Sequence, residues 1–350
     1  MLASGRVSRC AFVLARLLAC LSLAAAAIPT SAADVQYRVV FATASQLEGQ
    51  LDEQGREGFA CVGLARPEPG AGVPGVVAIL GRASNQAESV VAHRVIVGGR
   101  ADMKVPLSKA GAEGFRLCGL VLDEGPPGPG NVAVMARTAP GAWQYEAEVL
   151  LRYKESLARL NAIGRDGYLP VAAAAIDNNR VPDMRNWMVI AERPASGGAA
   201  REVTVRSDSG PTGLGRNLND SGKQGYRVEL LWKEGNDYVS MMTRPSGDAS
   251  TPHAYVVEGE DLARMHFLHG LVLADFPYLD RRLFVSDSAV RASNELVEEG
   301  LPPLDVRGRA ALRTVGDHIS RNRGFEVSYA RVTRDRAGKL LLSVAMARKD

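Results

Sequence analysis

The spacing of apolar positions along the chain alternates between two periods. Leu157, Leu160 and Ile163 recur three residues apart, which indicates one buried face of a helix. Val228 and Leu230 alternate with polar neighbours, which predicts a strand with one buried side. This switch from helical to strand-like spacing occurs five times, each time across a short step that contains glycine.

The step has the form Gly-x-x-Gly-aromatic, and it predicts the end of a helix followed by a tight turn. Four full copies stand at Gly55–Phe59, Gly111–Phe115, Gly164–Tyr168 and Gly222–Tyr226, and a weaker fifth at Arg321–Phe325 lacks the first glycine. We expect the first glycine to end each helix in a left-handed conformation. The second glycine then permits the turn into the next strand.

A turn-rich segment and a second apolar strand follow each step, and these closing strands end in Arg82, Arg137, Arg193, Arg244 and Arg348. An opening strand precedes the helix in the first four units. The predicted fold class is therefore α+β, with tandem βαββ units whose antiparallel sheets are covered by helices on one face. The predicted units span residues 34–83, 91–138, 144–194, 200–246 and 253–350.

The fifth unit departs from this plan. Residues 254–257 resemble its opening strand, but its helix begins only near Arg309, which predicts an insertion at 259–308. Within the insertion, 261–273 and 289–299 have the spacing of helices. Insertions on a repeat scaffold often carry function, and irregular terminal units also serve as caps, so both interpretations stand.

The unit resembles the bacterial βαββ domain of unknown function of the 4177 type. The resemblance rests on the opening strand, the leucine-rich helix, the glycine step and the hairpin that closes on a basic residue. It covers nearly all of the chain after the leader, apart from the insertion, and implies a fold without an activity. The family usually carries tryptophan at the positions of Phe59, Phe115, Tyr168, Tyr226 and Phe325.

The sequence leaves open whether the units pair, form an open array or close into a ring. A closed ring of five would resemble the α/β propellers of guanidine-modifying enzymes, which use a nucleophilic cysteine. Cys61 and Cys118 fall inside predicted strands, which argues against that chemistry.

The first 33 residues predict a secretory signal peptide that is cut after Ala33. Three arginines without an acidic residue precede an apolar run at 17–28, which Pro29 ends. This run is shorter than the roughly 20 residues that a membrane span needs. Leu17–Cys20 resembles a lipoprotein cleavage site, but cutting there would leave an apolar start, so we favour a periplasmic or secreted protein over lipid attachment.

The charge balance argues against a nucleic-acid partner. The chain has 42 Lys and Arg against 39 Asp and Glu, and three of the arginines lie in the predicted leader, so 39 of each would remain. Nucleic-acid binding needs a concentrated basic surface. We also expect no transmembrane segment in the chain after the leader.

The two cysteines after the leader favour free thiols. Cys61 lies two residues after Phe59, whereas Cys118 lies three after Phe115, so regular strands would point them to opposite faces. A bulge in one strand would still allow a bridge.

Two sets of residues are candidates for a site. His266 and His269 would share a helix face, and Asp261 or Asp275 could supply a carboxylate to complete a metal site, although helix histidines more often pack. The five closing arginines could together grip a phosphate or carboxylate, although pairing with acidic neighbours is their ordinary role.

No cofactor motif is present, and we expect no cofactor. The sequence thus favours an exported, non-enzymatic binding protein whose partner is an envelope protein or a glycan. A metal-dependent hydrolase centred on 259–308 and a structural spacer are the alternatives.

Overall fold

The computed structural model divides the chain into two compact segments, residues 1–33 and Asp34–Asp350, and all of the βαββ units lie in the second segment. It describes residues 34–67, 73, 75–84, 89–98, 102–123, 130–150, 153–175, 187–234, 237–247, 251–259, 271–273, 283–301, 308–321, 326–335 and 337–349. The predicted signal peptide lies outside these residues.

Each of the first four units consists of an opening strand, a helix, a second strand and a closing strand. We call the second strand the central strand because it stands between the helix and the closing strand in the sequence. The first contains β1 (Val35–Ala42), α2 (Ala44–Gly55), β2 (Ala60–Pro67) and β3 (Val76–Ala83). The second contains β4 (Ala92–Gly98), α3 (Lys104–Ala112), β5 (Arg116–Asp123) and β6 (Gly130–Arg137). The third contains β7 (Trp143–Leu150), α4 (Tyr153–Arg165), β8 (Leu169–Ala175) and β9 (Trp187–Pro194). The fourth contains β10 (Arg201–Asp208), α5 (Pro211–Gly222), β11 (Arg227–Glu234) and β12 (Asp237–Pro245).

In every unit the closing strand lies in the middle of the sheet. The strand orders are β1-β3-β2, β4-β6-β5, β7-β9-β8 and β10-β12-β11, and all of these pairs are antiparallel. The prediction of repeated antiparallel sheets in an α+β fold is therefore confirmed.

The fifth unit corrects the sequence interpretation in two places. It contains β13 (Tyr255–Gly259), β14 (Leu271–Leu273), β15 (Leu283–Gly300), α7 (Gly308–Ser320), β16 (Glu326–Arg334) and β17 (Leu340–Lys349). The helix predicted at 289–299 is wrong, because this segment belongs to β15 and its residues 292–300 pair with β17. The opening strand predicted at 254–257 is present as β13, but its pairing differs from that of the other opening strands, since β13 pairs with β15 and not with the closing strand.

Both differences have one physical cause. Pairing with β17 gives residues 292–300 a complete ladder of backbone hydrogen bonds, which outweighs a weak local preference for helix. The other stretch predicted as a helix, 261–273, ends in strand β14, and its residues 261–270 lie outside the described part.

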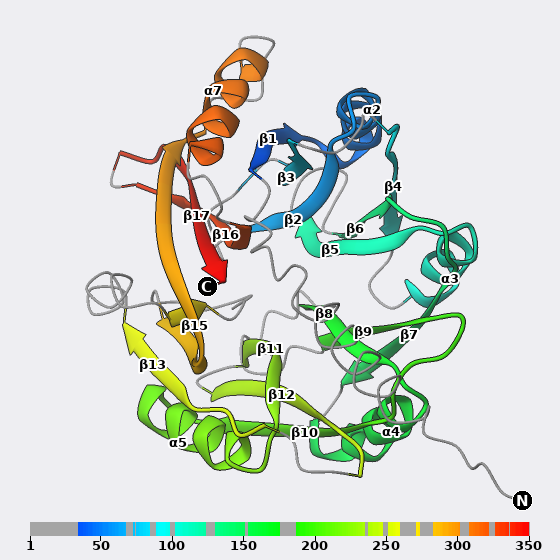
Figure 1. Ribbon diagram of the computed structural model, residues 1–350, viewed down its shortest axis with the longest axis vertical. Coiled ribbons are helices and arrows are strands. Elements are labelled where there is room, and N and C mark those ends of the chain that lie inside the picture. The colour runs from blue at the N-terminus through cyan, green and yellow to red at the C-terminus, as the bar shows by residue number, and fades with distance from the viewer. Residues whose placement is uncertain are drawn as a thin grey trace, which may run out of the picture. The chain divides into compact units, whose positions relative to one another are not determined.

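Contacts between units run in a closed cycle within Asp34–Asp350. Each helix contacts the first strand of the next unit, so that α2 meets β4, α3 meets β7, α4 meets β10, and α5 meets β13. The last helix, α7, contacts β1 of the first unit (Figure 1). The central strands of the last and first units, β16 and β2, also form a short parallel pair.

The first glycine of each step lets a helix approach the neighbouring unit. Gly55 is the last residue of α2, and the following Arg56 keeps a right-handed conformation, so the predicted left-handed helix end at this glycine is wrong. A Cβ atom at Gly55 would lie 2.0 Å from the carbonyl oxygen of Val91. The second glycine takes the left-handed conformation instead, with φ of 82° at Gly58.

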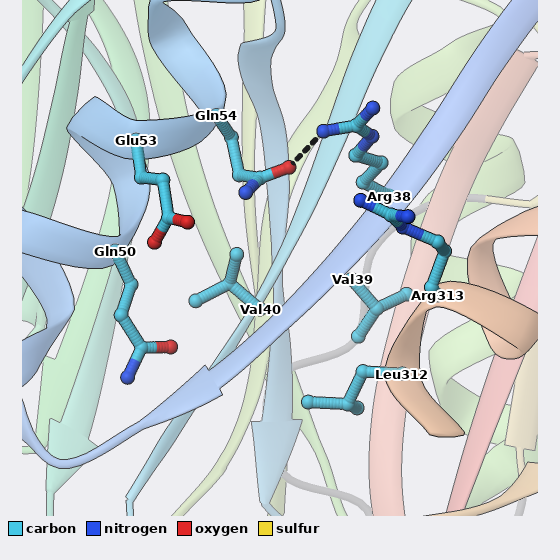
Figure 2. A pocket seen from close by; sticks show the side chains of 8 residues that line it. All are labelled: Arg38, Val39, Val40, Gln50, Glu53, Gln54, Leu312 and Arg313. Atoms are coloured by element: carbon cyan, nitrogen blue, oxygen red, sulfur yellow. Dashed lines mark hydrogen bonds between the residues drawn. The ribbon is translucent and has the colours of Figure 1, made fainter. Parts of the chain in front are cut away.

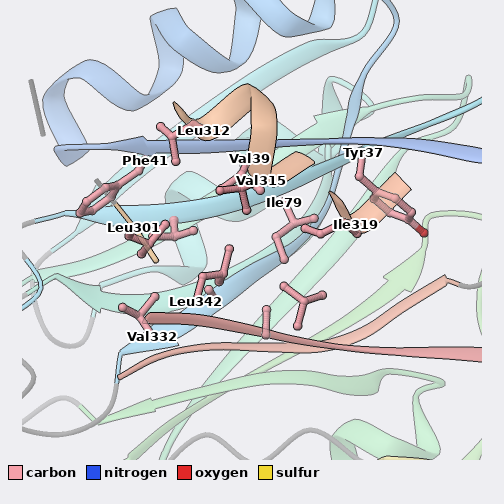
Figure 3. Close-up of a cluster of buried hydrophobic side chains, with 14 of the residues drawn as sticks. Tyr37, Val39, Phe41, Ile79, Leu301, Leu312, Val315, Ile319, Val332 and Leu342 are labelled. Carbon is pink, nitrogen blue, oxygen red and sulfur yellow. The ribbon is translucent and has the colours of Figure 1, made fainter. Parts of the chain in front are cut away.

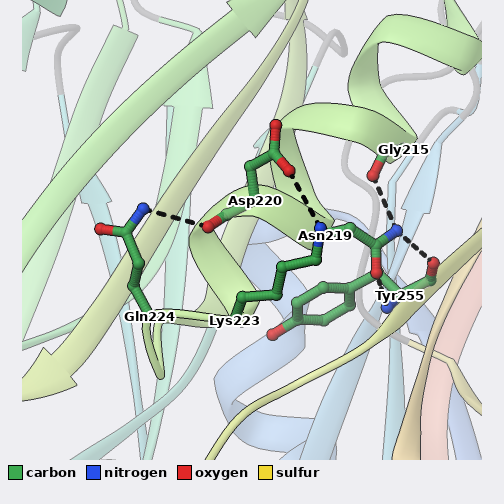
Figure 4. A network of polar contacts seen from close by, with 6 residues as sticks. All are labelled: Gly215, Asn219, Asp220, Lys223, Gln224 and Tyr255. Atoms are coloured by element: carbon green, nitrogen blue, oxygen red, sulfur yellow. Dashed lines mark hydrogen bonds and ion pairs between the residues drawn. The ribbon is translucent and has the colours of Figure 1, made fainter.

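A polar side chain of each helix bonds the backbone of the next unit. Asn219 of α5 accepts from the amide nitrogen of Tyr255 at 2.8 Å and donates to its carbonyl oxygen at 2.7 Å (Figure 4). Ser320 of α7 makes the corresponding bond to the amide nitrogen of Tyr37, at 2.7 Å. The junction between the last and first units therefore uses the same type of contact as the internal junctions.

A bulge interrupts each central strand three residues after the aromatic position. In the second unit the bulge residue is Cys118, which breaks the alternation of side chains. Its side chain therefore forms a disulfide with Cys61, with a Cα–Cα distance of 5.9 Å. The expectation of two free thiols is wrong, because it assumed regular strands.

The backbone amide beside each bulge is bonded by the next unit. Leu117 donates to the hydroxyl oxygen of Tyr145 at 2.8 Å, and Val327 donates to that of Tyr37 at 3.3 Å. The third unit has Pro170 at this position, which has no N–H to satisfy, and the matching residue of the next unit is Val203. The junction whose strand has no amide hydrogen to donate is thus also the one whose neighbouring unit has no side-chain acceptor at this position.

The apolar cluster at the closing junction joins the first and last units. Tyr37 and Val39 of β1 pack with Leu312, Val315 and Ile319 of α7, and the cluster extends into strands of both units (Figure 3). Residues 312, 315 and 319 share one face of α7 and are all buried. Burial of this face holds α7 against β1.

Candidate functional site

The closing arginines form contacts within their own units. In the first four units the guanidinium group lies over the aromatic residue of the Gly-x-x-Gly-aromatic step. The distance from its carbon atom to the ring centre is 4.8 Å at Arg82, 5.1 Å at Arg137, 4.4 Å at Arg193 and 4.6 Å at Arg244. Each also donates to the carbonyl oxygen of the residue before the second glycine. These contacts fasten the turn to the sheet. Arg348 lies in β17, and its side chain is outside the described part.

The metal candidates His266, His269 and Asp275 lie outside the described residues. Within the described ranges, no three His, Cys, Asp or Glu side chains come together in a way that could hold a metal ion. The metal site therefore stays a prediction.

A cleft lies at the junction where the cycle closes, with residues of α2, β1 and α7 around it. It consists of two adjoining cavities of about 360 Å³ and 710 Å³, and both are lined by Arg38 and Arg313. The smaller also contacts Gln50 and Glu53 of α2, and Figure 2 shows these side chains with the two arginines. We name this feature the junction cleft.

Arg38 is held in a fixed position at the junction cleft. Its guanidinium group donates to the side-chain oxygen of Gln54 and to the carboxylate of Glu57, the latter at 2.6 Å. It also lies over the ring of Phe59 at 4.2 Å, and Arg82 covers the same ring. Several contacts on one guanidinium group leave it little conformational freedom, so it is preorganised.

The Arg313 side chain is exposed on α7. It forms no hydrogen bond or ion pair with any described residue, and neither does Asp317 one turn further along the helix. The charge of Arg313 still reaches the cleft. The hydrogen bond from Arg38 chiefly lowers the pKa of Glu57, and the positive charges of Arg38, Arg313 and Arg82 lower it further.

The polar groups of the cleft that could act as nucleophiles are occupied. The Ser320 hydroxyl donates to the carbonyl oxygen of Gly316 at 2.7 Å and accepts from the amide nitrogen of Tyr37. Burial raises the pKa of Tyr37 to about 12, so the phenol stays protonated.

The junction between the first and second units provides an internal comparison. Arg94 bonds Glu113 at 2.7 Å and lies over Phe115 at 4.5 Å, much as Arg38 does with Glu57 and Phe59. The helix across β4 presents acids there: Glu48 and Asp52 of α2 accept from backbone amides of β4. At the closing junction, the Ser320 hydroxyl of α7 accepts from the corresponding amide of β1, and Arg313 of α7 lies beside the cleft.

Sequence reasoning missed Arg38 and Arg313 because they come from opposite ends of the described chain. A signal was present in the sequence: Arg38 and Arg94 occupy the same position of two units, directly after Tyr37 and His93. That Arg38 and a residue of α7 line the same cleft follows only from the contact between α7 and β1, which closes the cycle of units.

No known protein-family profile matches the chain, and none of the curated proteins is significantly similar to it. Within its described part, the chain has no helix with the length and apolarity that crossing a membrane requires.

Proposed function

We propose that this chain is an exported, non-enzymatic binding protein of the cell envelope and that the junction cleft is its binding element. The observation that carries the proposal is Arg313, which lies beside the cavity and forms no hydrogen bond or ion pair with a residue that the structure describes, because such a charge is available to a ligand. The occupied Ser320 and the protonated Tyr37 favour binding over catalysis.

The cleft volume suits a small molecule or the end of a glycan or peptide chain. The proposal includes the predicted signal peptide, units that resemble the βαββ domain of the 4177 type, and helices that cover one face of the sheets. The hydrolase alternative centres on the insertion at 259–308, whose metal candidates His266, His269 and Asp275 lie outside the described part, and no described contact favours it.

Export and binding are tested separately. N-terminal sequencing of the protein from a periplasmic or culture fraction should begin at Asp34, and recovery only of the uncut chain in the cytoplasm would contradict export. For binding, a panel of polar small molecules is screened by thermal shift. We expect at least one molecule to stabilise the protein.

A matched pair of variants locates the binding element. Gln50→Trp places an indole in the smaller cavity, whereas Gln46→Trp puts the same side chain one turn earlier on α2, where it does not line the cleft. We expect the first variant alone to abolish the shift. A panel without any binder, or equal loss in both variants, would end the proposal.

A further inference from the structure

Two guanidinium groups face the same cavity at the closing junction. Arg38 is held by Gln54, Glu57 and Phe59, whereas Arg313 approaches from α7 without a partner of its own. Figure 2 shows that they come from different elements, β1 and α7. Guanidinium forks match the planar, two-oxygen geometry of carboxylates and the oxygens of phosphates.

One oxyanion of the protein itself, the carboxylate of Glu57, already bonds Arg38 at the cleft. The Glu57 carboxylate bonds Arg38 at 2.6 Å and is exposed at the edge of the larger cavity. The positive surroundings favour its ionised form. A ligand oxyanion that enters the cleft would meet the same Arg38 and, in addition, the uncommitted Arg313.

The acidic residues of the cleft are distributed between its two cavities. Glu57 is paired with Arg38, so one arginine and one acid already balance each other. Glu53 lines only the smaller cavity, and Asp317 only the larger. The two arginines are the charged residues that both cavities share.

We propose that the junction cleft binds an oxyanion, a carboxylate or phosphate group of a small ligand, between Arg38 and Arg313. The proposal rests on the proposed function and names the ligand class of that site. The closing junction differs from the first one in charge: Glu48 and Asp52 of α2 bond amides of β4, whereas Ser320 of α7 bonds the amide of Tyr37 in β1, and Arg313 of α7 lies beside the cleft.

The test is calorimetric titration of the purified protein at low ionic strength and pH 7, with inorganic phosphate and with succinate as separate probes. We expect at least one to bind at one site. Binding of phosphate alone identifies a phosphate ligand, and binding of succinate alone identifies a carboxylate ligand. Arg313→Gln should weaken binding at least about tenfold, since it removes a charge-assisted contact.

Two further variants keep the test sharp. Arg94→Gln removes the equivalent arginine of the second unit and should change the affinity less than about twofold, because Arg94 does not line the junction cleft. Glu57→Gln removes the internal competitor for Arg38 and should strengthen binding severalfold.

The inference fails if neither anion binds the wild-type protein, or if Arg313→Gln binds as wild type does. It also fails if Arg94→Gln weakens binding as much as Arg313→Gln. If neutral or cationic molecules of the screening panel bind in the cleft while both anions fail, the inference alone falls. If nothing binds there, the proposed function falls with it.

Discussion

Alanine substitutions at two glycines of α2 separate helix propensity from contact between units. No atom lies within 4 Å of the place that a Cβ atom would take at Gly49, so Gly49→Ala should stabilise the protein by roughly 0.5–1 kcal/mol through helix propensity alone. Gly55→Ala places its Cβ 2.0 Å from the carbonyl oxygen of Val91 and 3.0 Å from His93. Both atoms belong to the neighbouring unit, so the strand must move.

The cost of that movement sets the sign of the effect. Overpacking of a close contact costs about 1–3 kcal/mol. The hydrogen bond from the Val91 amide to the Gly55 carbonyl oxygen, now 2.9 Å long, contributes about another 1 kcal/mol if it breaks. The gain in helix propensity, again roughly 0.5–1 kcal/mol, offsets part of these costs, so we expect Gly55→Ala to destabilise the protein by about 1–3 kcal/mol.

Urea denaturation followed by circular dichroism measures both variants against wild type. The two substitutions are chemically identical and lie in one helix, so their difference reports the contact between units. If Gly55→Ala stabilised the protein as much as Gly49→Ala, the close approach of helix and strand would be refuted.

Three other predictions address the remaining contacts. Tyr145→Phe should cost about 1–3 kcal/mol in urea denaturation, because the amide of Leu117 loses its acceptor at 2.8 Å; an unchanged midpoint would contradict this bond. Non-reducing peptide mapping should find Cys61 joined to Cys118, and reduction should lower stability by up to about 4 kcal/mol for a loop of 57 residues; two titratable thiols in the untreated protein would refute the bridge. Burial raises the pKa of Glu192 above 4.5, so its contribution to stability is full below about pH 4.5 and is lost as the pH rises through the folded-state pKa. Relative to Glu192→Gln, wild type should therefore lose stability between pH 4 and pH 8, and parallel pH profiles would contradict the raised pKa.

Local patterns predicted the regular part of the fold because the information is local there. The spacing of Leu157 and Leu160 marks a helix, and Gly167 marks a turn, whatever the neighbouring units do. The role of the first glycine was misassigned for the opposite reason. Gly164 is required by the approach of Arg201 in the next unit, which no local pattern shows.

The errors in the last unit have a tertiary origin. Residues 289–299 have apolar positions that fit a helix, and only pairing with β17 makes them a strand. The face of Cys118 also depended on a bulge, which a strict period of two does not include.

The candidate site was beyond the reach of sequence patterns. Arg38 and Arg313 gain their meaning from the packing of α7 on β1, which closes the cycle. The closing arginines recur because, in the first four units, each lies over the aromatic ring of its own unit. The departure from the repeat, and not the repeat itself, marks the cleft.

A crystal structure of the protein soaked with the tighter-binding of phosphate and succinate tests the central claim most directly. We expect α7 packed on β1 and electron density for the anion between the guanidinium groups of Arg38 and Arg313. An α7 that lies away from β1, or an anion bound only elsewhere, would contradict the account.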